Sequence, residues 1–398
     1  MKVAFINSVA GFGSTGRLVS TLSMMETVEG KVYYGRKEDS SNANSIRFTG
    51  SVGNVEHAVC TYLFDSHGFH NAIETKRMLK DLDEFNPDIV HLHNLHGYYI
   101  HVGILFDYLK KKNKKVIWTL HDCWSMTGHC AHFDGIGCNK WKEKCYDCPI
   151  TKEYPFSWNK HNVTKNYERK KEVFTSIQDN LTIVTPSSWL ANVVKESYLK
   201  ECNVMTIHNG IDLNVFKYNE KSSFRKQYHL EDKFIVLAIA SVWDNTKGLD
   251  HLEKLAKELP DNIQLVVVGA TNTKDTVNID KALCIPRTSS ISELCDIYSN
   301  ADVFINLTRQ DTFPTVNIEA MACGLPVLTY KTGGSPEILT SDTGIVIEKN
   351  DLYAMEDTII ELSKNNTFKK EDCIRNASKY SLENMYQEYL ELYKKVMV

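Results

Sequence analysis

The sequence predicts an α/β fold of two domains, each built on a parallel β-sheet that is covered by helices. The chain has 398 residues, which is enough for two full-sized hydrophobic cores. Short apolar runs alternate with amphipathic segments along its whole length. The apolar runs are continuous, as expected for strands that are buried on both faces of a parallel sheet.

The first half of the chain contains the strands of the first domain. We interpret five apolar runs as strands: Val3–Asn7, Lys31–Tyr34, Ile89–His93, Val116–His121 and Leu181–Thr185. A sixth run, Val204–Ile207, precedes the turn-forming cluster Asn209-Gly210-Ile211-Asp212. We place the boundary at this cluster, so that the first domain covers residues 1–208 and the second residues 209–380.

The second half repeats the pattern. Its expected strands are Phe234–Ala240, Gln264–Val268, Val303–Leu307, Pro326–Tyr330 and Gly344–Ile347, and its expected helices are about 248–258, 291–299, 316–323 and 351–364. A final amphipathic stretch over 381–398 predicts a C-terminal helix that packs back on the first domain.

Composition excludes several classes of protein. With 42% hydrophobic and 24% charged residues and a net charge of −4, the chain resembles neither a disordered protein nor a fibre or coiled coil. It has no apolar run of the length that spans a membrane and no secretory leader pattern. Eleven cysteines are too few for a disulfide scaffold. We therefore expect a cytoplasmic protein that has no nucleic-acid partner.

Charge is divided unevenly between the two halves. The first half is net basic and the second is net acidic, and residues 140–171 form a basic stretch. Basic residues are attracted to anionic lipid headgroups. The stretch predicts peripheral contact with the inner face of a membrane.

A glycine-rich loop follows the first strand. Gly11-Phe12-Gly13-Ser14-Thr15-Gly16 opens a helix, and glycines there allow a ligand to approach backbone N–H groups at the helix N-terminus. Against a nicotinamide site, the second strand ends at Tyr34-Gly35-Arg36 and not at an acidic residue.

A second motif places two acids eight residues apart. It runs Asp311-Thr312-Phe313-Pro314-Thr315-Val316-Asn317-Ile318-Glu319 and continues to Val327. The predicted helix begins near Thr315, so its N-terminal N–H groups and positive dipole could face a diphosphate or a sugar. Glu319 lies one turn further on, where its carboxylate could accept hydrogen bonds from ribose hydroxyls.

These residues resemble a known family. Asp311 to Val327 resembles the E-x7-E segment of retaining glycosyltransferases of family four, which have the GT-B fold of two Rossmann-like domains facing across a cleft. Further landmarks follow in that family's order: the glycine loop, Trp118-Thr119-Leu120-His121-Asp122, Thr185-Pro186-Ser187-Ser188, Asn209-Gly210-Ile211-Asp212, Lys247-Gly248 and Gly333-Gly334-Ser335-Pro336-Glu337. The stretch from His121 onward is similar to a subgroup found in bacterial capsule and exopolysaccharide synthesis.

The resemblance implies a donor site in the second domain. Lys247 would neutralise the diphosphate, Asp311 would hold sugar hydroxyls, and Glu319 would bind the ribose. Thr312, Phe313, Pro314, Thr315 and Val316 would line the donor. The backbone N–H groups between Phe313 and Val316, of which Pro314 has none, would support Asp311. From the acceptor-binding first domain, His121 would meet the donor sugar and Gly13 the nearer phosphate. The catalytic set is thus His121, Lys247 and Asp311.

The resemblance also implies the reaction. The chain would move a hexose-type sugar from a UDP- or GDP-sugar to a glycan or lipid-linked acceptor, with retention of configuration and without a metal cofactor. It departs from the family where an Arg usually precedes the lysine; Ser241 to Thr246 occupy that space here, and Arg287 is the expected substitute. The first acid is Asp311 in place of Glu, and Thr312 stands where Gly is common.

Five cysteines fall in a predicted insertion over residues 122–150. Cys145 and Cys148 have the spacing of a zinc knuckle, and with Cys130 and Cys138 they would form a structural zinc site. Disulfides and free buried thiols are the alternatives. Of the other candidate metal ligands, Asp81 and Asp83 fall on a helical pattern and predict a solvated face. His91, His93 and His96 predict histidines that line the cleft and contact the acceptor.

Two rival functions are left open by the sequence. A GT-B epimerase would convert a nucleotide-sugar without an acceptor, and a non-catalytic protein would bind a nucleotide-sugar or glycan without turnover.

Overall fold

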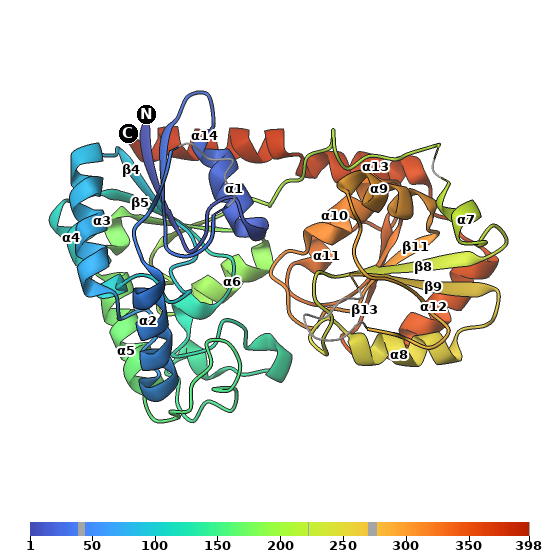
Figure 1. Cartoon of the computed structure of the whole chain (residues 1–398), viewed down its shortest axis with the longest axis horizontal. Helices are drawn as coiled ribbons and strands as arrows, with labels where there is room; N and C mark the ends of the chain where they lie inside the picture. Colours follow the sequence, from blue (N-terminus) through green and yellow to red (C-terminus); the bar gives the residue numbers. More distant parts are fainter. Residues whose placement is uncertain (39–43, 222, 270–276, 398) are drawn as a thin grey trace. The chain divides into compact units, whose positions relative to one another are not determined.

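The computed structural model describes residues 1–38, 44–221, 223–269 and 277–397. The chain divides into two compact units, residues 1–207 with 386–398 and residues 208–385, each built on its own parallel sheet (Figure 1). This confirms the predicted α/β class.

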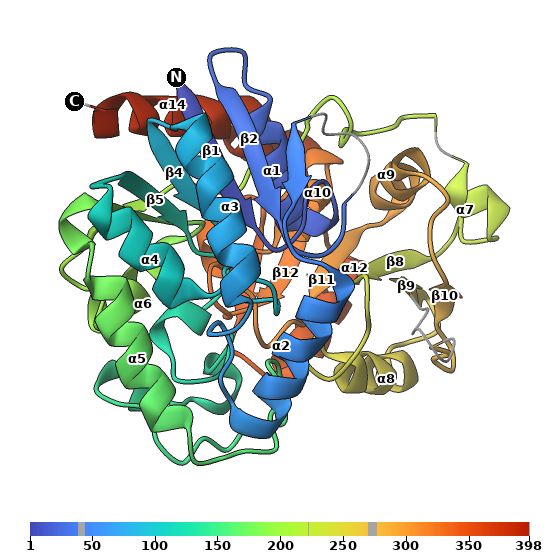
Figure 2. The same ribbon diagram turned by 60° about the vertical axis from the view of Figure 1, so that its left-hand side comes forward.

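Unit 1 contains a sheet of seven parallel strands in the order β3-β2-β1-β4-β5-β6-β7, of which Figure 2 shows β2, β1, β4 and β5 side by side. The strands are β1 (Lys2–Asn7), β2 (Glu29–Tyr34), β3 (Ser45–Arg47), β4 (Ile89–Leu92), β5 (Lys115–Thr119), β6 (Leu181–Thr185) and β7 (Asn203–Thr206). The helices are α1 (Gly13–Ser23), α2 (Ser51–Phe64), α3 (Ala72–Phe85), α4 (Val102–Lys111), α5 (Val163–Thr175) and α6 (Ser188–Glu196).

Unit 2 contains a sheet of six parallel strands in the order β10-β9-β8-β11-β12-β13. The strands are β8 (Phe234–Ile239), β9 (Ile263–Val268), β10 (Leu283–Ile285), β11 (Val303–Asn306), β12 (Val327–Tyr330) and β13 (Gly344–Ile347). The helices are α7 (Phe224–Gln227), α8 (Leu249–Glu258), α9 (Ile291–Asn300), α10 (Thr315–Ala322), α11 (Ser335–Ile338), α12 (Leu352–Lys364), α13 (Lys370–Ala377) and α14 (Leu382–Met397), which continues into unit 1.

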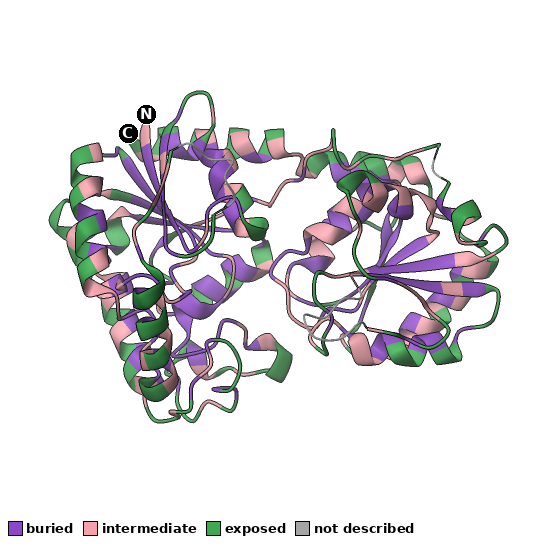
Figure 3. Ribbon diagram, viewed as in Figure 1, coloured by how far each residue is buried: buried purple, intermediate pink, exposed green. Residues whose placement is uncertain are grey.

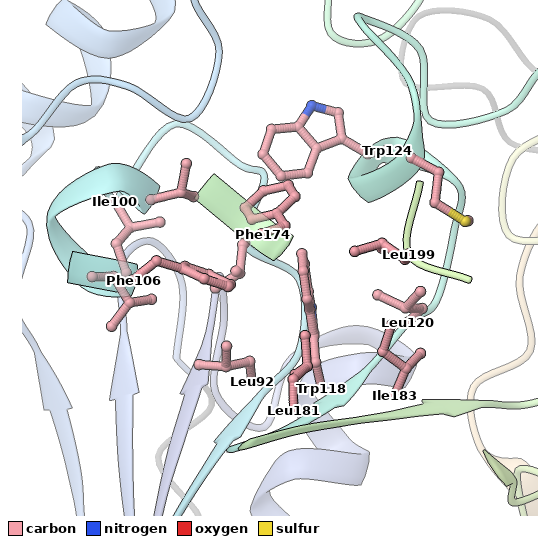
Figure 4. Close-up of a cluster of buried hydrophobic side chains, with 14 of the residues drawn as sticks. Leu92, Ile100, Phe106, Trp118, Leu120, Trp124, Phe174, Leu181, Ile183 and Leu199 are labelled. Atoms are coloured by element: carbon pink, nitrogen blue, oxygen red, sulfur yellow. The ribbon is translucent and has the colours of Figure 1, made fainter. Parts of the chain in front are cut away.

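The core of unit 1 holds the end of β5 in place. Trp118, at the end of this strand, packs on Phe106 and Phe174 at ring-centroid distances of 5.7 and 4.8 Å, and Trp124 extends the cluster from the segment after the strand (Figure 4). The indole N–H of Trp118 also donates to the backbone oxygen of His93, 2.9 Å away. The aromatic core therefore fixes the positions of the backbone at His93 and at the start of the segment that carries His121.

The last helix belongs partly to unit 1. The hydroxyls of Tyr393 and Tyr389 in α14 lie 2.8 Å from Nδ1 of His91 and 3.1 Å from the Thr119 hydroxyl, and both tyrosines are buried. His91 and Thr119 also contact each other at 2.8 Å. The end of α14 thus packs against β4 and β5 through a buried polar network.

Candidate active site

The acidic motif of unit 2 forms a loop between β11 and α10. Asp311 follows β11, and its Oδ1 accepts a hydrogen bond from the Phe313 N–H at 3.2 Å. This hydrogen bond orients the Asp311 carboxylate. It also engages the Phe313 N–H, one of the backbone groups that we expected to support Asp311 in holding the donor. The side chains of Thr312, Phe313 and Pro314 are buried, whereas those of Thr315 and Val316 are half-buried. The first three can therefore contribute to a ligand mainly through their backbone.

Lys247 and Asp311 meet although they are far apart in the sequence. Nζ of Lys247 lies 3.0 Å from Oδ2 of Asp311 and 3.4 Å from the Thr308 hydroxyl. Strands β8 and β11 are neighbours, so the loops that follow them lie at the same edge of the sheet. Gly248, which precedes α8, has φ +83°, and a Cβ there would lie 2.5 Å from the Leu307 side chain. This close approach brings Lys247 next to the acidic loop.

A second glycine supports the same loop. Gly333 has φ +51°, and a Cβ at this position would lie 1.7 Å from the backbone oxygen of Asp311. The next residue, Gly334, donates its N–H to the Thr312 oxygen at 3.2 Å. The Gly333-Gly334 landmark therefore packs directly against the acidic loop and determines its path.

Glu319 lies in the middle of α10 and is half-buried. Its carboxylate accepts hydrogen bonds from the hydroxyls of Thr315 and Tyr298, each at 3.3 Å. Tyr298 is fully buried, and burial together with the nearby Glu319 charge raises the pKa of its phenol well above the usual range. Tyr298 therefore stays a hydrogen-bond donor that orients Glu319. The N-cap residue of the helix, Pro314, makes no side-chain hydrogen bond to the first-turn amides.

Arg309 is a residue of this site that the sequence did not reveal. Its guanidinium binds both carboxylate oxygens of Asp250 in α8, at 2.7 and 3.0 Å. Its backbone N–H also donates to the Thr246 oxygen, next to Lys247, at 2.8 Å. Arg309 thus braces the lysine loop against the acidic loop. Nothing in the local sequence pairs Arg309 with Asp250, which is 59 residues away.

Arg287 lies apart from this group. It is exposed and follows β10, which is separated from β8 by β9 in the sheet. No hydrogen bond or ion pair of Arg287 is found in the part of the chain that the structure describes. Its expected role towards the phosphates stays a prediction.

In unit 1, Gly13 and His121 follow two strands of the same sheet, β1 and β5. Gly13 is the first residue of α1, after β1, and a Cβ there would meet no atom within 4 Å, so the backbone at this point is open to a ligand. His121 follows β5, two strands away from β1. We keep as predictions the expected roles of both residues towards the donor.

His121 is half-buried and lies beside the buried His93. Its Nε2 lies 3.1 Å from Nδ1 of His93, and the two rings stack at 5.4 Å. Burial lowers the pKa of His121 to about 4, although the adjacent Asp122 opposes this effect. Burial would raise the pKa of Asp122, but His96, 2.5 Å away, outweighs it and lowers that pKa to about 2. Near neutral pH, a neutral His121 therefore stands beside a carboxylate.

The other candidate ligands of unit 1 have structural partners. His91 is buried and bonds to Thr119 and Tyr393, so the expectation that it contacts an acceptor is wrong. His93 and His96 line a small hollow together with His121 and Asp122, and their contact with an acceptor stays a prediction. Asp81 pairs with Lys31 at 2.6 Å, and Asp83 pairs with Lys112 at 2.8 Å. These two acids form ion pairs with neighbouring elements and do not meet each other as metal ligands would.

The cysteines of the insertion lie around one small hollow. Cys130, Cys138, Cys145 and Cys148 line it, and the Cys130 and Cys148 thiols contact each other. All eleven cysteines are free thiols. Over the described ranges, no group of three or more His, Cys, Asp or Glu side chains is arranged to hold a metal ion. The zinc site stays a prediction, which a measurement of the metal content of protein purified without chelator would test.

Comparison with known proteins decides the family. Residues 220–380 match the family described as glycosyl transferases group 1, and residues 32–215 match the one described as glycosyltransferase family 4. The chain belongs to these glycosyltransferases. The resemblance predicted from the motifs is thereby confirmed, as is the prediction that the protein is an enzyme.

Relatives of this glycosyltransferase include polysaccharide enzymes. The putative colanic acid biosynthesis glycosyl transferase WcaC of Escherichia coli is 25% identical over 373 residues, which cover 90% of this chain and 89% of that protein. The capsular polysaccharide biosynthesis glycosyltransferase CapM of Staphylococcus aureus is 26% identical over 194 residues, 44% of this chain and half of that protein.

Solved structures share the fold of the glycosyltransferase. Sucrose-phosphate synthase from Thermosynechococcus elongatus matches with a TM-score of 0.70 at 15% identity, covering 99% of this chain and 98% of that one. Anabaena HepE in complex with UDP matches with a TM-score of 0.68 at 14% identity, covering 99% and 100%. At these identities the likeness concerns the fold, which is GT-B. Among the described residues, no helix combines the length and apolar composition needed to cross a bilayer.

Proposed function

We propose that the glycosyltransferase moves a hexose-type sugar from a nucleotide-sugar, linked to UDP or GDP, to a glycan or lipid-linked acceptor of a bacterial surface polysaccharide. The contact between Lys247 and Asp311 at the N-terminal side of α10 carries this proposal. It combines a cation for a diphosphate, a carboxylate for sugar hydroxyls and uncapped helix amides for an anion. The polysaccharide enzymes WcaC and CapM, and the UDP complex of HepE, support the acceptor and donor classes.

Unit 2 would bind the donor and unit 1 the acceptor. As the bond between sugar and phosphate breaks, negative charge develops on the diphosphate, and Lys247 and the α10 dipole stabilise it. Glu319, oriented by Tyr298, accepts hydrogen bonds from the ribose. We propose a retaining reaction in which a donor phosphate oxygen takes the acceptor proton. The neutral His121 then contacts the sugar and is not required as a base, and the protein groups replace a metal ion.

The location of the protein follows from this proposal. A nucleotide-sugar and a lipid-linked acceptor meet at the inner face of the cell membrane, so we propose a cytoplasmic protein with peripheral membrane contact.

A panel of nucleotide-sugars tests the donor assignment. A ligand that binds the folded state raises the midpoint of thermal unfolding, so UDP- or GDP-sugars should shift it and NAD should not. Incubation with the best donor alone, followed by NMR, distinguishes the rivals. A new sugar isomer without acceptor would indicate an epimerase. Binding without turnover across a panel of acceptor glycans and lipids would favour a non-catalytic protein.

A further inference from the structure

Helix α2 carries an inverted distribution of polar and apolar residues. It spans Ser51–Phe64 and contains one charged residue, Glu56. The fully buried positions are Gly53, His57 and Thr61, whereas the aliphatic side chains face outward. His57 is held inside by Asn71 at 2.5 Å and by the Gly68 N–H at 2.9 Å. A helix on a soluble surface normally shows the opposite pattern.

The outward side chains form one continuous row. Val52, Val55, Val59 and Leu63 are spaced at i, i+3, i+7 and i+11 and are between 45% and 83% exposed. We call this row the apolar face of α2. Figure 3 shows exposed residues recurring along the helix between intermediate and buried ones. An aligned row of aliphatic side chains in water is unfavourable unless something covers it, and it marks an interaction site.

Further exposed apolar residues lie near both ends of α2. The backbone N–H of Trp158 donates to the Tyr62 oxygen at 2.9 Å, which places this tryptophan, 65% exposed, at the C-terminal end of α2. At the other end, Gly53 lies against Asn71 and Glu74 at the start of α3, where Ile73 is exposed. A tryptophan at the edge of an apolar row is typical of a surface that enters the boundary between lipid headgroups and acyl chains.

Exposed basic residues belong to the segments next to both ends of α2. Lys152, Lys160 and Lys165 lie near Trp158 in the chain and are exposed, and none of them pairs with a carboxylate in the described ranges. At the other end, Lys76 and Arg77 are exposed beside Ile73. The exposed or half-buried acids of the same segments are Glu56, Glu74 and Glu153, and Asp65 at the end of α2 is buried against His129, so positive charge is in excess at the surface.

We expected the basic stretch 140–171 to contact a membrane, and the structure shows which of its lysines are already bound within the protein. Lys140 donates to the backbone oxygens of Tyr146 and Asp147, and Lys142 and Lys144 pair with Glu196 and Glu168. These three lysines are engaged within the protein. Lys170 is buried and donates to the Trp124 oxygen at 2.7 Å. Lys152, Lys160 and Lys165 remain exposed and available to a partner.

We propose that the apolar face of α2 docks on the surface of an anionic lipid bilayer. Charge complementarity selects this occupant: aliphatic residues and Trp158 would enter the headgroup region while lysines at both ends contact anionic headgroups. A second copy of the chain fits less well, because both ends of the face are basic and would meet like charges. The inference rests on the proposed function, because a lipid-linked acceptor would be embedded in such a bilayer.

Sedimentation of the full chain with sucrose-loaded vesicles, without donor, tests the proposal. Binding should be stronger to phosphatidylcholine vesicles that contain phosphatidylglycerol than to phosphatidylcholine alone, and should weaken with salt. The double variant Val55→Asp/Val59→Asp should bind on the order of tenfold or more weakly, since two charges replace methyl groups that would enter the lipid headgroup region. Tyr353→Asp is the matched control, because this residue is 81% exposed on α12 in unit 2.

Two further measurements separate the outcomes. Tryptophan emission should shift to shorter wavelength on binding, and Trp158→Phe should remove the shift. Lys160→Glu/Lys165→Glu should weaken binding and flatten its salt dependence. Equal binding by Val55→Asp/Val59→Asp, or a dimer in light scattering that this variant dissolves while vesicles do not bind, would overturn the proposal. Stabilisation by a nucleotide-sugar should be the same in every variant, so failure of membrane docking is distinguishable from failure of the donor assignment.

Discussion

Lys247 and Asp311 form an ion pair with Nζ and Oδ2 3.0 Å apart, on loops that follow two neighbouring strands. Both side chains are partly exposed, at 37% and 24%. An ion pair of this exposure contributes about 1 kcal/mol or less to stability. The pair is therefore better explained as a pre-positioned charge arrangement for a ligand than as a stabilising contact.

Replacement of Lys247 separates these two roles. We expect Lys247→Ala to lower kcat/KM for glycosyl transfer by tenfold or more, on the order of a lost charge-assisted hydrogen bond, with little change in the unfolding midpoint. Lys331→Ala is the matched control, since Lys331 forms an exposed ion pair with Glu348 in the same unit at 2.8 Å. Equal activity of the two variants would remove Lys247 from the site.

Glu319 offers a test of donor binding that is separate from turnover. We expect Glu319→Ala to weaken binding of the nucleotide diphosphate tenfold or more in calorimetry, because the ribose loses its carboxylate partner. Tyr298→Phe should weaken binding less, since it removes only the hydroxyl that orients Glu319. Unchanged binding in Glu319→Ala would contradict the assignment of the donor site to α10.

Features formed by residues close together in the sequence could be predicted, whereas contacts between residues far apart in the sequence could not. The strands were predicted because each is a continuous apolar run, but β3 and β10 have only three residues and lie at sheet edges, where no such run is needed. Helix α2 was not predicted from the sequence, and the outward direction of its aliphatic residues depends on how it packs on the rest of unit 1. Asp311 and Glu319 were predicted from one local motif. The contacts of Lys247 with Asp311 and of Arg309 with Asp250 arise only when the loops after β8 and β11 meet.

The contact of His93 with His121 leads to a prediction about proton position. Nε2 of His93 is buried without a hydrogen-bond partner in the described residues. An unpaired lone pair in that position costs less than an unpaired N–H, so Nδ1 of His93 should carry the proton and donate it to Nε2 of His121. His121 would then carry its own proton on Nδ1 and act as a hydrogen-bond donor, in agreement with a reaction that needs no protein base.

Nitrogen-15 NMR of the histidine rings measures this arrangement directly. We expect the Nδ1–H form of His121 in the native protein, a changed or mixed form in His93→Leu, and recovery in His93→Asn, whose amide can donate from nearly the same point. Transfer activity should follow the same order. An Nε2–H form of native His121 would contradict this prediction, because the proton shared by the two rings would then lie on His121 and not on His93.

Buried neutral histidines predict a loss of stability in mild acid. Burial lowers the pKa of His57 and His91 to about 3 and that of His121 to about 4, from 6.5 in the unfolded chain. Between pH 6.5 and about 4 the unfolded chain binds more protons, so their stabilisation is present above pH 6.5 and is lost as pH falls. Each histidine adds up to about 1.4 kcal/mol per pH unit to the slope. Urea unfolding at pH 7.5, 6 and 5 measures it, and a flat dependence would contradict the burial.

The glycine that supports the acidic loop provides the last test. Gly333→Ala should disturb the loop, because the new Cβ would lie 1.7 Å from the Asp311 oxygen, in addition to the strain of φ +51°. Gly137→Ala separates the two effects, since Gly137 has φ +62° but meets nothing within 4 Å. Backbone strain alone costs about 1 kcal/mol, so both variants should lose that stability, as measured by urea unfolding. Only Gly333→Ala should also lose nucleotide binding in calorimetry, because only there does the steric conflict move the carboxylate. Equal nucleotide affinity in the two variants would mean that the Asp311 loop tolerates displacement and that its geometry does not determine donor binding.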